Sequence, residues 1–325
     1  MANKTELDSS LLDLPLQQLT KTTIASEYWA SPHQNQRLNS VDFDLQSFWT
    51  YYSKECTRAL HNGGRYVAMR SHRDVVDCIR KLKRGMLRHD IKEELRENFT
   101  ALHDNEDEML DNSIDLAASL LLMISFCSFT SSQLAKENVK MEKIFTARNL
   151  CRIAGLDIVW TDNLVDHLRL TDDDCRVHVF HHASFLHVQQ QSADSLLPKG
   201  LADETLQTLA LLFPSSDVET RKWFSKLDAD IDRRAIQCGQ LKTDHRQTEK
   251  FRFWNDRLVV LKQVFDEAQP KSLSQWWHDR RNGVQWYTFW VAVLVLVLTI
   301  FFGLVQSIEG ALQVYASFKG LDGST

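Results

Sequence analysis

The sequence predicts a mainly α-helical protein: a multi-helix cytosolic domain with a small two-stranded β ribbon, followed by one C-terminal transmembrane helix. Twenty uncharged residues at 286–305, WYTFWVAVLVLVLTIFFGLV, would cover about 30 Å as a helix, the thickness of a bilayer's hydrocarbon core. Elsewhere, apolar residues recur mainly three and four positions apart, which is helical spacing. Only 156–160 and 176–180 are rich in β-forming residues, and they predict the ribbon.

Composition narrows the class of protein. The 325 residues are 43% hydrophobic and 25% charged, as in folded proteins. A net charge of −5 with no basic tail argues against a nucleic-acid partner. The six cysteines lie at least 22 positions apart, so no zinc knuckle or CxxC motif is present and a reducing compartment is indicated.

Breaks in the apolar pattern divide the chain into five segments. Pro15 and the polar stretch 31–40 indicate an arm, Pro198 marks a linker, and Pro270 ends the last soluble helix. We therefore expect a loosely ordered arm at 1–40, a helical domain at 41–200 with the ribbon near 156–180, a helical extension packed on it at 201–270, a membrane-anchoring helix at 271–318 and a tail at 319–325.

Helices are expected in order along the soluble part. One runs over 44–60, Ser71 caps a second, and Asp90 caps a third. The apolar run 116–129 predicts a buried core helix, with a re-entrant membrane segment as the alternative. A further helix spans 144–154. Beyond the linker, Asp203 caps a helix over 204–213, Ser216 begins another, and a 3-4-3-4 apolar stripe predicts a helix over 251–265.

The second helix and its flanks are basic. Residues 65–92 hold nine Lys or Arg against three acids. A solvated helix face explains this, and contact with an anionic membrane surface or an acidic protein partner is the sharper reading. The acids at 104–115 offer an internal partner. If an external partner binds, its contacts are expected at the central basic residues, Arg80, Lys81, Lys83 and Arg84.

The span itself is expected to contact lipid along its whole surface. Its aromatic and apolar positions include Trp286, Tyr287, Phe289, Trp290, Leu294, Leu296, Leu298, Ile300, Phe301, Phe302 and Leu304. Lys271, Arg280 and Arg281 precede the span, whereas only Lys319 follows it closely. Basic residues stay cytoplasmic, so the N-terminal region is expected in the cytosol, in a tail-anchored, single-pass layout. The helix is expected to continue past the bilayer as a short amphipathic end.

Four stretches resemble a large group of uncharacterised proteins of filamentous fungi. They are WTDNLVDHLRL (160–170), FHHASFL (180–186), LADETLQTLALLFP (201–214) and QWWHDRRNGVQWYTFWVAVLVLVLTIFFGLVQSIEGALQVY (275–315). The likeness is strong over the C-terminal half and loose before it. It implies a C-terminal membrane segment and no established activity.

Candidate chemistry is sparse. Five of the twelve histidines cluster at 167–187, near Asp166 and Asp172–Asp174, and a His/Asp metal site there would use His178 and His182. His89-Asp90 and His103-Asp104 superficially resemble the HD pattern of helical metal phosphohydrolases. No Walker loop, GxGxxG, GxSxG or HExxH occurs. The sequence therefore favours a membrane-anchored, non-catalytic scaffold or interaction module without a cofactor. The alternative is a metal-dependent hydrolase.

Overall fold

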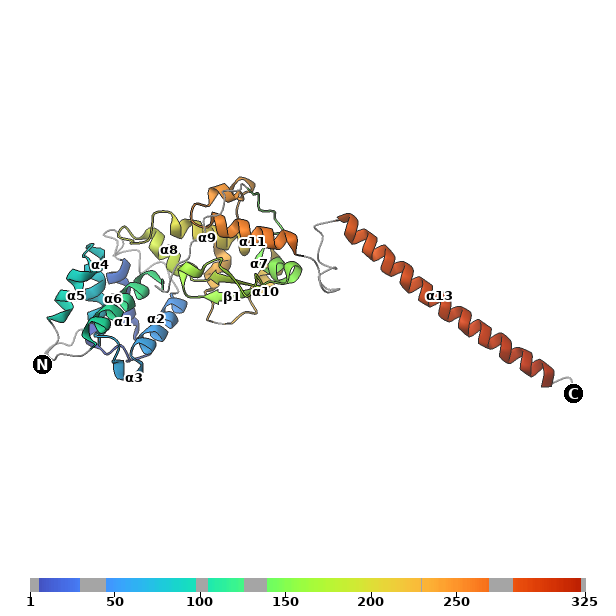
Figure 1. Ribbon diagram of the computed structural model, residues 1–325, viewed down its shortest axis with the longest axis horizontal. Coiled ribbons are helices and arrows are strands. Elements are labelled where there is room, and N and C mark those ends of the chain that lie inside the picture. The colour runs from blue at the N-terminus through green and yellow to red at the C-terminus, as the bar shows by residue number, and fades with distance from the viewer. Residues whose placement is uncertain are drawn as a thin grey trace. The chain divides into compact units, whose positions relative to one another are not determined.

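A computed structural model describes residues 6–29, 45–97, 105–125, 139–228, 230–268 and 283–322 (Figure 1). The chain divides into two compact units. Unit 1 comprises Met1–Cys151 and Leu156–Glu267, and unit 2 comprises Arg152–Gly155 and Ala268–Thr325. Within the described residues the protein is mainly helical, with one small sheet in unit 1 and one long C-terminal helix in unit 2, as the sequence predicts in outline.

The N-terminal part of unit 1 is built from six helices and a short 3₁₀ turn. They are η1 (Glu6–Asp8), α1 (Gln18–Trp29), α2 (Gln46–Ala59), α3 (His61–Gly64), α4 (His72–Lys83), α5 (Arg88–Arg96) and α6 (Glu106–Leu122). Helix α6 packs on α2, α4 and α5, so it lies at the centre of this group. Ile24 and Tyr28 of α1 are fully buried, so this helix belongs to the core and differs from the loose arm expected there. Residues 30–44 lie outside the described residues.

Local signals place some helix ends and miss others. Ser71 caps α4 as predicted, with a capping box in which the Asp74 carboxylate accepts a hydrogen bond from the backbone N–H of Ser71. Asp90 is not the cap of α5, because this helix already begins at Arg88 and Asp90 lies in its first turn. The core helix begins ten residues earlier than 116 and ends at Leu122, where Met123 takes a left-handed conformation with φ of 52°. Residues 126–129 of the expected core helix lie outside the described residues.

The predicted two-stranded ribbon is wrong. Unit 1 holds a three-stranded mixed sheet of order β1-β3-β2, formed by β1 (Asp157–Thr161), β2 (Leu170–Thr171) and β3 (Arg176–Phe180). β1 and β3 are parallel, with Thr161 opposite Phe180, whereas β2 and β3 are antiparallel. Parallel strands need a connection of about a dozen residues. Residues 162–175 supply that connection, so the two β-rich stretches do not form a hairpin with each other.

The helices that follow belong to unit 1, except for residues 152–154 of the π-helical turn, which belong to unit 2. They are α7 (Ala147–Asn149), which continues as the π-helical turn η2 (Leu150–Ala154), and then α8 (Ala183–Gln191), α9 (Leu201–Leu212), α10 (Val218–Phe224) and α11 (Asn255–Glu267). Gly200 precedes α9 and Asp217 caps α10, in place of the expected Asp203 and Ser216. Helix α8 packs on α9, and both pack on the 3₁₀ turn η4 (Arg233–Gln237).

A buried carboxylate fixes the start of α11. Glu204 of α9 accepts hydrogen bonds from the backbone N–H groups of Arg252, Phe253 and Trp254, at 2.7–2.8 Å. The Trp254 indole N–H also donates to the Thr205 hydroxyl over 2.9 Å. These N–H groups lie directly before α11, where a carboxylate also faces the positive end of the helix dipole, so Glu204 of α9 holds the backbone at the start of α11. The apolar stripe predicted over 251–265 is buried, but its first two residues, Phe251 and Trp254, precede the helix.

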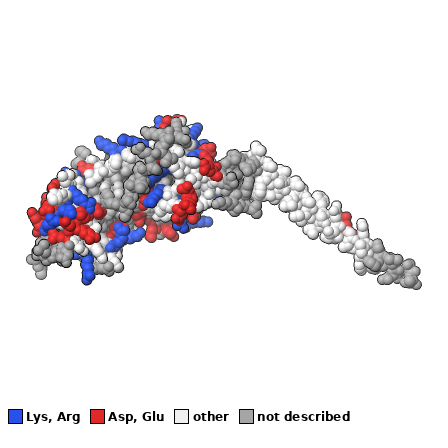
Figure 2. All heavy atoms as spheres, in the orientation of Figure 1, with Lys and Arg blue, Asp and Glu red and all other residues white. Residues whose placement is uncertain are grey.

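Unit 2 contains α13 (Gly283–Asp322), an unbroken helix of 40 residues. Among the described residues, Trp286–Tyr315 of this helix is long and apolar enough to cross a membrane, and none of it is buried. Figure 2 shows that its surface is almost free of charged side chains.

Candidate functional site

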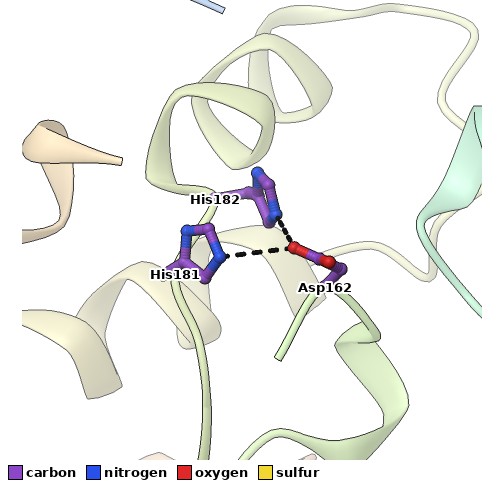
Figure 3. A group of neighbouring side chains, drawn as sticks. All are labelled: Asp162, His181 and His182. Atoms are coloured by element: carbon purple, nitrogen blue, oxygen red, sulfur yellow. Dashed lines mark hydrogen bonds and ion pairs between the residues drawn. The ribbon is translucent and has the colours of Figure 1, made fainter. Parts of the chain in front are cut away.

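Three polar side chains meet where the two parallel strands end. Asp162 follows β1 directly, and His181 and His182 follow β3 directly. Because neighbouring parallel strands end at the same edge of a sheet, the pairing of Thr161 with Phe180 brings these residues together. Figure 3 shows both imidazole rings directed at the Asp162 carboxylate. In the part of the chain that the structure describes, this is the one group of three metal-ligating side chains close enough to share an ion.

Both histidines contact the same carboxylate oxygen. Nε2 of His182 lies 2.8 Å from Oδ1 of Asp162, and Nε2 of His181 lies 3.3 Å from it. The two rings stack with centroids 4.0 Å apart. Lys54 of α2 approaches the second oxygen, Oδ2, at 3.5 Å, and Tyr51 of α2 lies beside the His182 ring. The histidines are buried, whereas the Asp162 side chain is 32% exposed, so the cluster reaches the surface through its carboxylate.

The hydrogen bonds determine where the protons of both rings lie. The backbone N–H of Asp232 donates to Nδ1 of His181 over 3.2 Å, so Nδ1 must carry a lone pair. In the neutral ring the proton then lies on Nε2, which donates it to Asp162. Nε2 of His182 faces the same carboxylate and is assigned the same role, which leaves its buried Nδ1 as an acceptor without a partner among the described residues.

The pKa values follow from burial and from these bonds. Burial alone would raise the pKa of Asp162, but the hydrogen bonds from His181 and His182 outweigh it and hold the pKa well below its usual range. Burial and the neighbouring His181 lower the pKa of His182 to about 4, although Asp162 opposes the shift. At neutral pH the cluster therefore holds an ionised carboxylate and a neutral His182.

These positions of the ring protons do not suit the binding of a metal ion. A histidine that binds a metal through one nitrogen donates its other ring N–H to an acceptor. Coordination through Nε2 of His181 would place an N–H on Nδ1, directly opposite the N–H of Asp232. Coordination by His182 would leave a buried Nδ1–H without an acceptor. The three side chains lie at suitable distances for an ion, but their hydrogen-bond partners favour a structural role that joins β1, β3 and the loop at 232.

Asp232 extends this network into α8. Its buried carboxylate accepts from the Ser184 backbone N–H at 2.6 Å, from the Ser184 hydroxyl at 3.0 Å and from the Arg234 backbone N–H at 2.9 Å. The residue therefore caps the first turn of α8 and the start of η4. Its backbone and side chain together connect His181 to both elements.

The predicted histidine pair is separated. His182 lies in the cluster, whereas His178 contacts the Thr171 hydroxyl at 3.1 Å in the neighbouring strand β2. His167 is buried between the backbone N–H of Phe180 and the Thr208 hydroxyl, and burial lowers its pKa to about 3. Asp162 and the role of His181 were not predicted from the sequence. Their position directly after two β-rich stretches was the available signal, and it is informative only for parallel strands.

The other candidate motifs have mixed outcomes. His103-Asp104 lies outside the described residues, so the HD pattern is untested.

The predicted basic cluster consists of Arg80, Lys81, Lys83 and Arg84. Arg80 pairs with Glu27 and Asp77, Lys81 pairs with Glu94, and Lys83 donates to the Glu27 carbonyl oxygen. The acids of α6 do find an internal partner in the basic region 65–92, because they pair with Arg88 and Lys92 of α5, and they also pair with Arg96. Figure 2 shows the resulting mixture of basic and acidic side chains over these helices.

Of the predicted membrane-facing residues, Trp286, Phe289 and Trp290 are partly covered and the others are exposed.

No protein-family model matches the chain, and no curated protein or solved structure matches it. The resemblance to a fungal protein group therefore stays a prediction.

Proposed function

We propose that α13 anchors this protein in a membrane and holds unit 1 on the cytosolic side as a non-catalytic scaffold or interaction module. The observation that carries the proposal is the exposure of Trp286–Tyr315, an apolar helix with no protein covering it. Thirteen of the residues 286–305 are Leu, Ile, Val or Phe. At about −0.3 to −0.6 kcal/mol each, they favour insertion by roughly 4 to 8 kcal/mol.

The orientation is supported by charge. Lys271, Arg280 and Arg281 precede the span, whereas Lys319 is the basic residue that follows it within twenty positions. The side with more Lys and Arg stays cytoplasmic. Unit 1 would then lie in the cytosol, where its scattered cysteines remain reduced thiols.

Alkaline carbonate extraction tests the anchor. We expect the full chain to stay with the membrane pellet and a version ending at Asn282 to become soluble. Protease added outside sealed vesicles that expose their cytosolic face should digest an N-terminal tag and spare a C-terminal one. A full chain that carbonate releases would refute the anchor, and the opposite protection pattern would refute the orientation.

Within the predicted basic cluster, Arg84 is the best candidate for contact with a protein partner. Three of the cluster's four residues have partners inside unit 1, whereas Arg84 is exposed and its side chain forms no ion pair or hydrogen bond within the described part of the chain. If an acidic partner uses this face, Arg84→Gln should remove it from a crosslinked membrane pull-down. Arg65→Gln, at another exposed arginine, is the control. Equal recovery of the partner with both variants would argue against the cluster.

The hydrolase alternative rests on Asp162, His181 and His182 rather than on His178. Metal analysis of the detergent-purified full chain tests it, with His178→Ala as the control for His182→Ala. Stoichiometric metal that is lost only in His182→Ala would support the alternative. Metal-free protein that keeps its fold would agree with the structural role inferred from the hydrogen bonds.

A further inference from the structure

Helix α13 is longer than a bilayer requires. Its 40 residues extend about 60 Å, whereas the hydrocarbon core measures about 30 Å and the whole bilayer about 40–45 Å. With residues 286–305 in the hydrocarbon core, Leu312 lies about 10 Å beyond Val305 along the axis and Tyr315 about 15 Å beyond it. A headgroup layer is only about 5–8 Å deep. Both side chains therefore pass through the headgroups into water.

The projecting part of α13 has two distinct faces. At about 100° per residue, Gln306, Glu309 and Gln313 fall within one 60° sector. On the other side, a continuous apolar stripe runs along the helix at a spacing of 4-4-3, formed by Leu304, Ile308, Leu312 and Tyr315. These four side chains are 59–65% exposed.

The helix cannot hide this stripe by bending. The stretch 283–322 contains no proline and forms one continuous helix, so its projecting end follows the direction of the span. An apolar stripe that passes rigidly into water needs a protein surface to cover it. Copies of a membrane protein inserted in one orientation present the same stripe at the same height.

We propose that the stripe of one copy packs against the stripe of a second copy, forming a parallel helix pair that continues past the far side of the bilayer. This inference rests on the proposed membrane insertion. The charge pattern favours a second copy as the occupant, because Glu309 lies about 100° from the centre of the stripe. Two like carboxylates therefore stay outside the contact. Ile308, Leu312 and Tyr315 also follow the 4-3 spacing of a helix-pairing seam.

Disulfide trapping in isolated membranes tests the pairing. The native cysteines all lie at or before position 238, so α13 itself carries none and the parent chain gives the background. We expect Ile308→Cys and Leu312→Cys to form at least about five times more linked dimer than Glu309→Cys and Gln313→Cys, because distance limits disulfide formation. Each variant is first required to resist carbonate extraction, which confirms that it is inserted.

The outcomes separate this inference from the anchor. Variants that resist carbonate but form no linked dimer, or form it equally at all four positions, overturn the helix pair and leave the anchor intact. A maximum at Ser307→Cys and Gly310→Cys also overturns it, because pairing then uses the face with small residues. Loss of dimer in Leu312→Glu, measured by co-purification of two differently tagged copies, would support the proposed stripe.

Discussion

The backbone N–H of Asp232 donates to Nδ1 of His181 over 3.2 Å, and this contact decides which nitrogen of the imidazole carries the proton. His181 therefore directs an N–H at Asp162, and His182 directs a second one at the same oxygen. A single, partly exposed carboxylate thus satisfies two buried donors from the end of the adjacent strand. Its contribution to stability can be measured.

Removing this acceptor should destabilise unit 1. Asp162→Ala leaves two buried N–H donors unpaired, at a cost of about 1–3 kcal/mol for each. Asp162→Asn keeps an oxygen in place and should cost clearly less. Urea unfolding of the detergent-purified full chain, followed by near-UV circular dichroism, measures both variants. Equal stability of Asp162→Ala and the parent chain would contradict the structural role of the cluster.

Acid should destabilise the protein through its buried histidines. The pKa values of His72, His167 and His182 fall to about 4, 3 and 4, chiefly because burial disfavours the charged ring. Below the ordinary value of 6.5 the unfolded chain binds more protons than the folded one. The free energy of unfolding is therefore retained above pH 6.5 and falls as the pH drops towards 4. Each histidine contributes at most about 3 kcal/mol over that window.

A pH series of unfolding midpoints checks this expectation. His72→Gln removes one titrating ring and should make the decline shallower. His89→Gln, at an exposed position of α5, should leave the slope unchanged. Midpoints that stay constant between pH 6.5 and 4.5 would show that these histidines do not carry the acid sensitivity.

A close approach at Gly64 makes this residue sensitive to substitution. Its φ is +71°, and an added Cβ would lie 2.7 Å from Nη1 of Arg70. That guanidinium is held by the carbonyl oxygens of Gly64 and Val67, at 2.8 and 2.6 Å. Gly64→Ala should therefore cost more than Gly85→Ala, where φ is +74° but no atom lies within 4 Å of the added Cβ. Backbone strain alone costs about 1–2 kcal/mol.

Thermal unfolding of the two glycine variants separates strain from steric conflict. Because the two φ values nearly match, the difference between the variants reports the conflict with Arg70 and with Leu60, whose Cδ2 would lie 2.8 Å from the added Cβ. A smaller loss for Gly64→Ala than for Gly85→Ala would mean that both side chains move aside at little cost.

The turn between β2 and β3 can be stabilised. Asp172, Asp173 and Asp174 all have positive φ, from 51° to 60°. Glycine adopts this conformation without the steric cost that an L side chain carries. Asp173→Gly should therefore raise stability by about 0.5–1 kcal/mol, whereas Asp157→Gly in strand β1 should lower it. A lower melting temperature for Asp173→Gly would indicate that its side chain has a stabilising contact.

The sequence by itself determined the features that depend on neighbours along the chain. The capping box of Ser71 and Asp74 needs residues three positions apart, and the span at 286–305 needs only length and apolar composition. Such features do not depend on distant parts of the chain, because local hydrogen bonds and the transfer of apolar side chains out of water stabilise them. The continuation of α13 beyond Val305, as far as Asp322, was predicted on the same basis.

Only the tertiary structure decided which distant segments meet. The parallel pairing of β1 with β3, the meeting of Asp162 with His181, and the capture of the Arg252–Trp254 backbone by Glu204 join residues 19 to 50 positions apart. Short β-rich stretches are compatible with either strand direction. In the folded protein the parallel pairing accompanies complete burial of Val177, Val179 and Phe180, and no local pattern specifies it. Strand direction in turn determined the candidate site, because it placed the three polar side chains at one edge of the sheet.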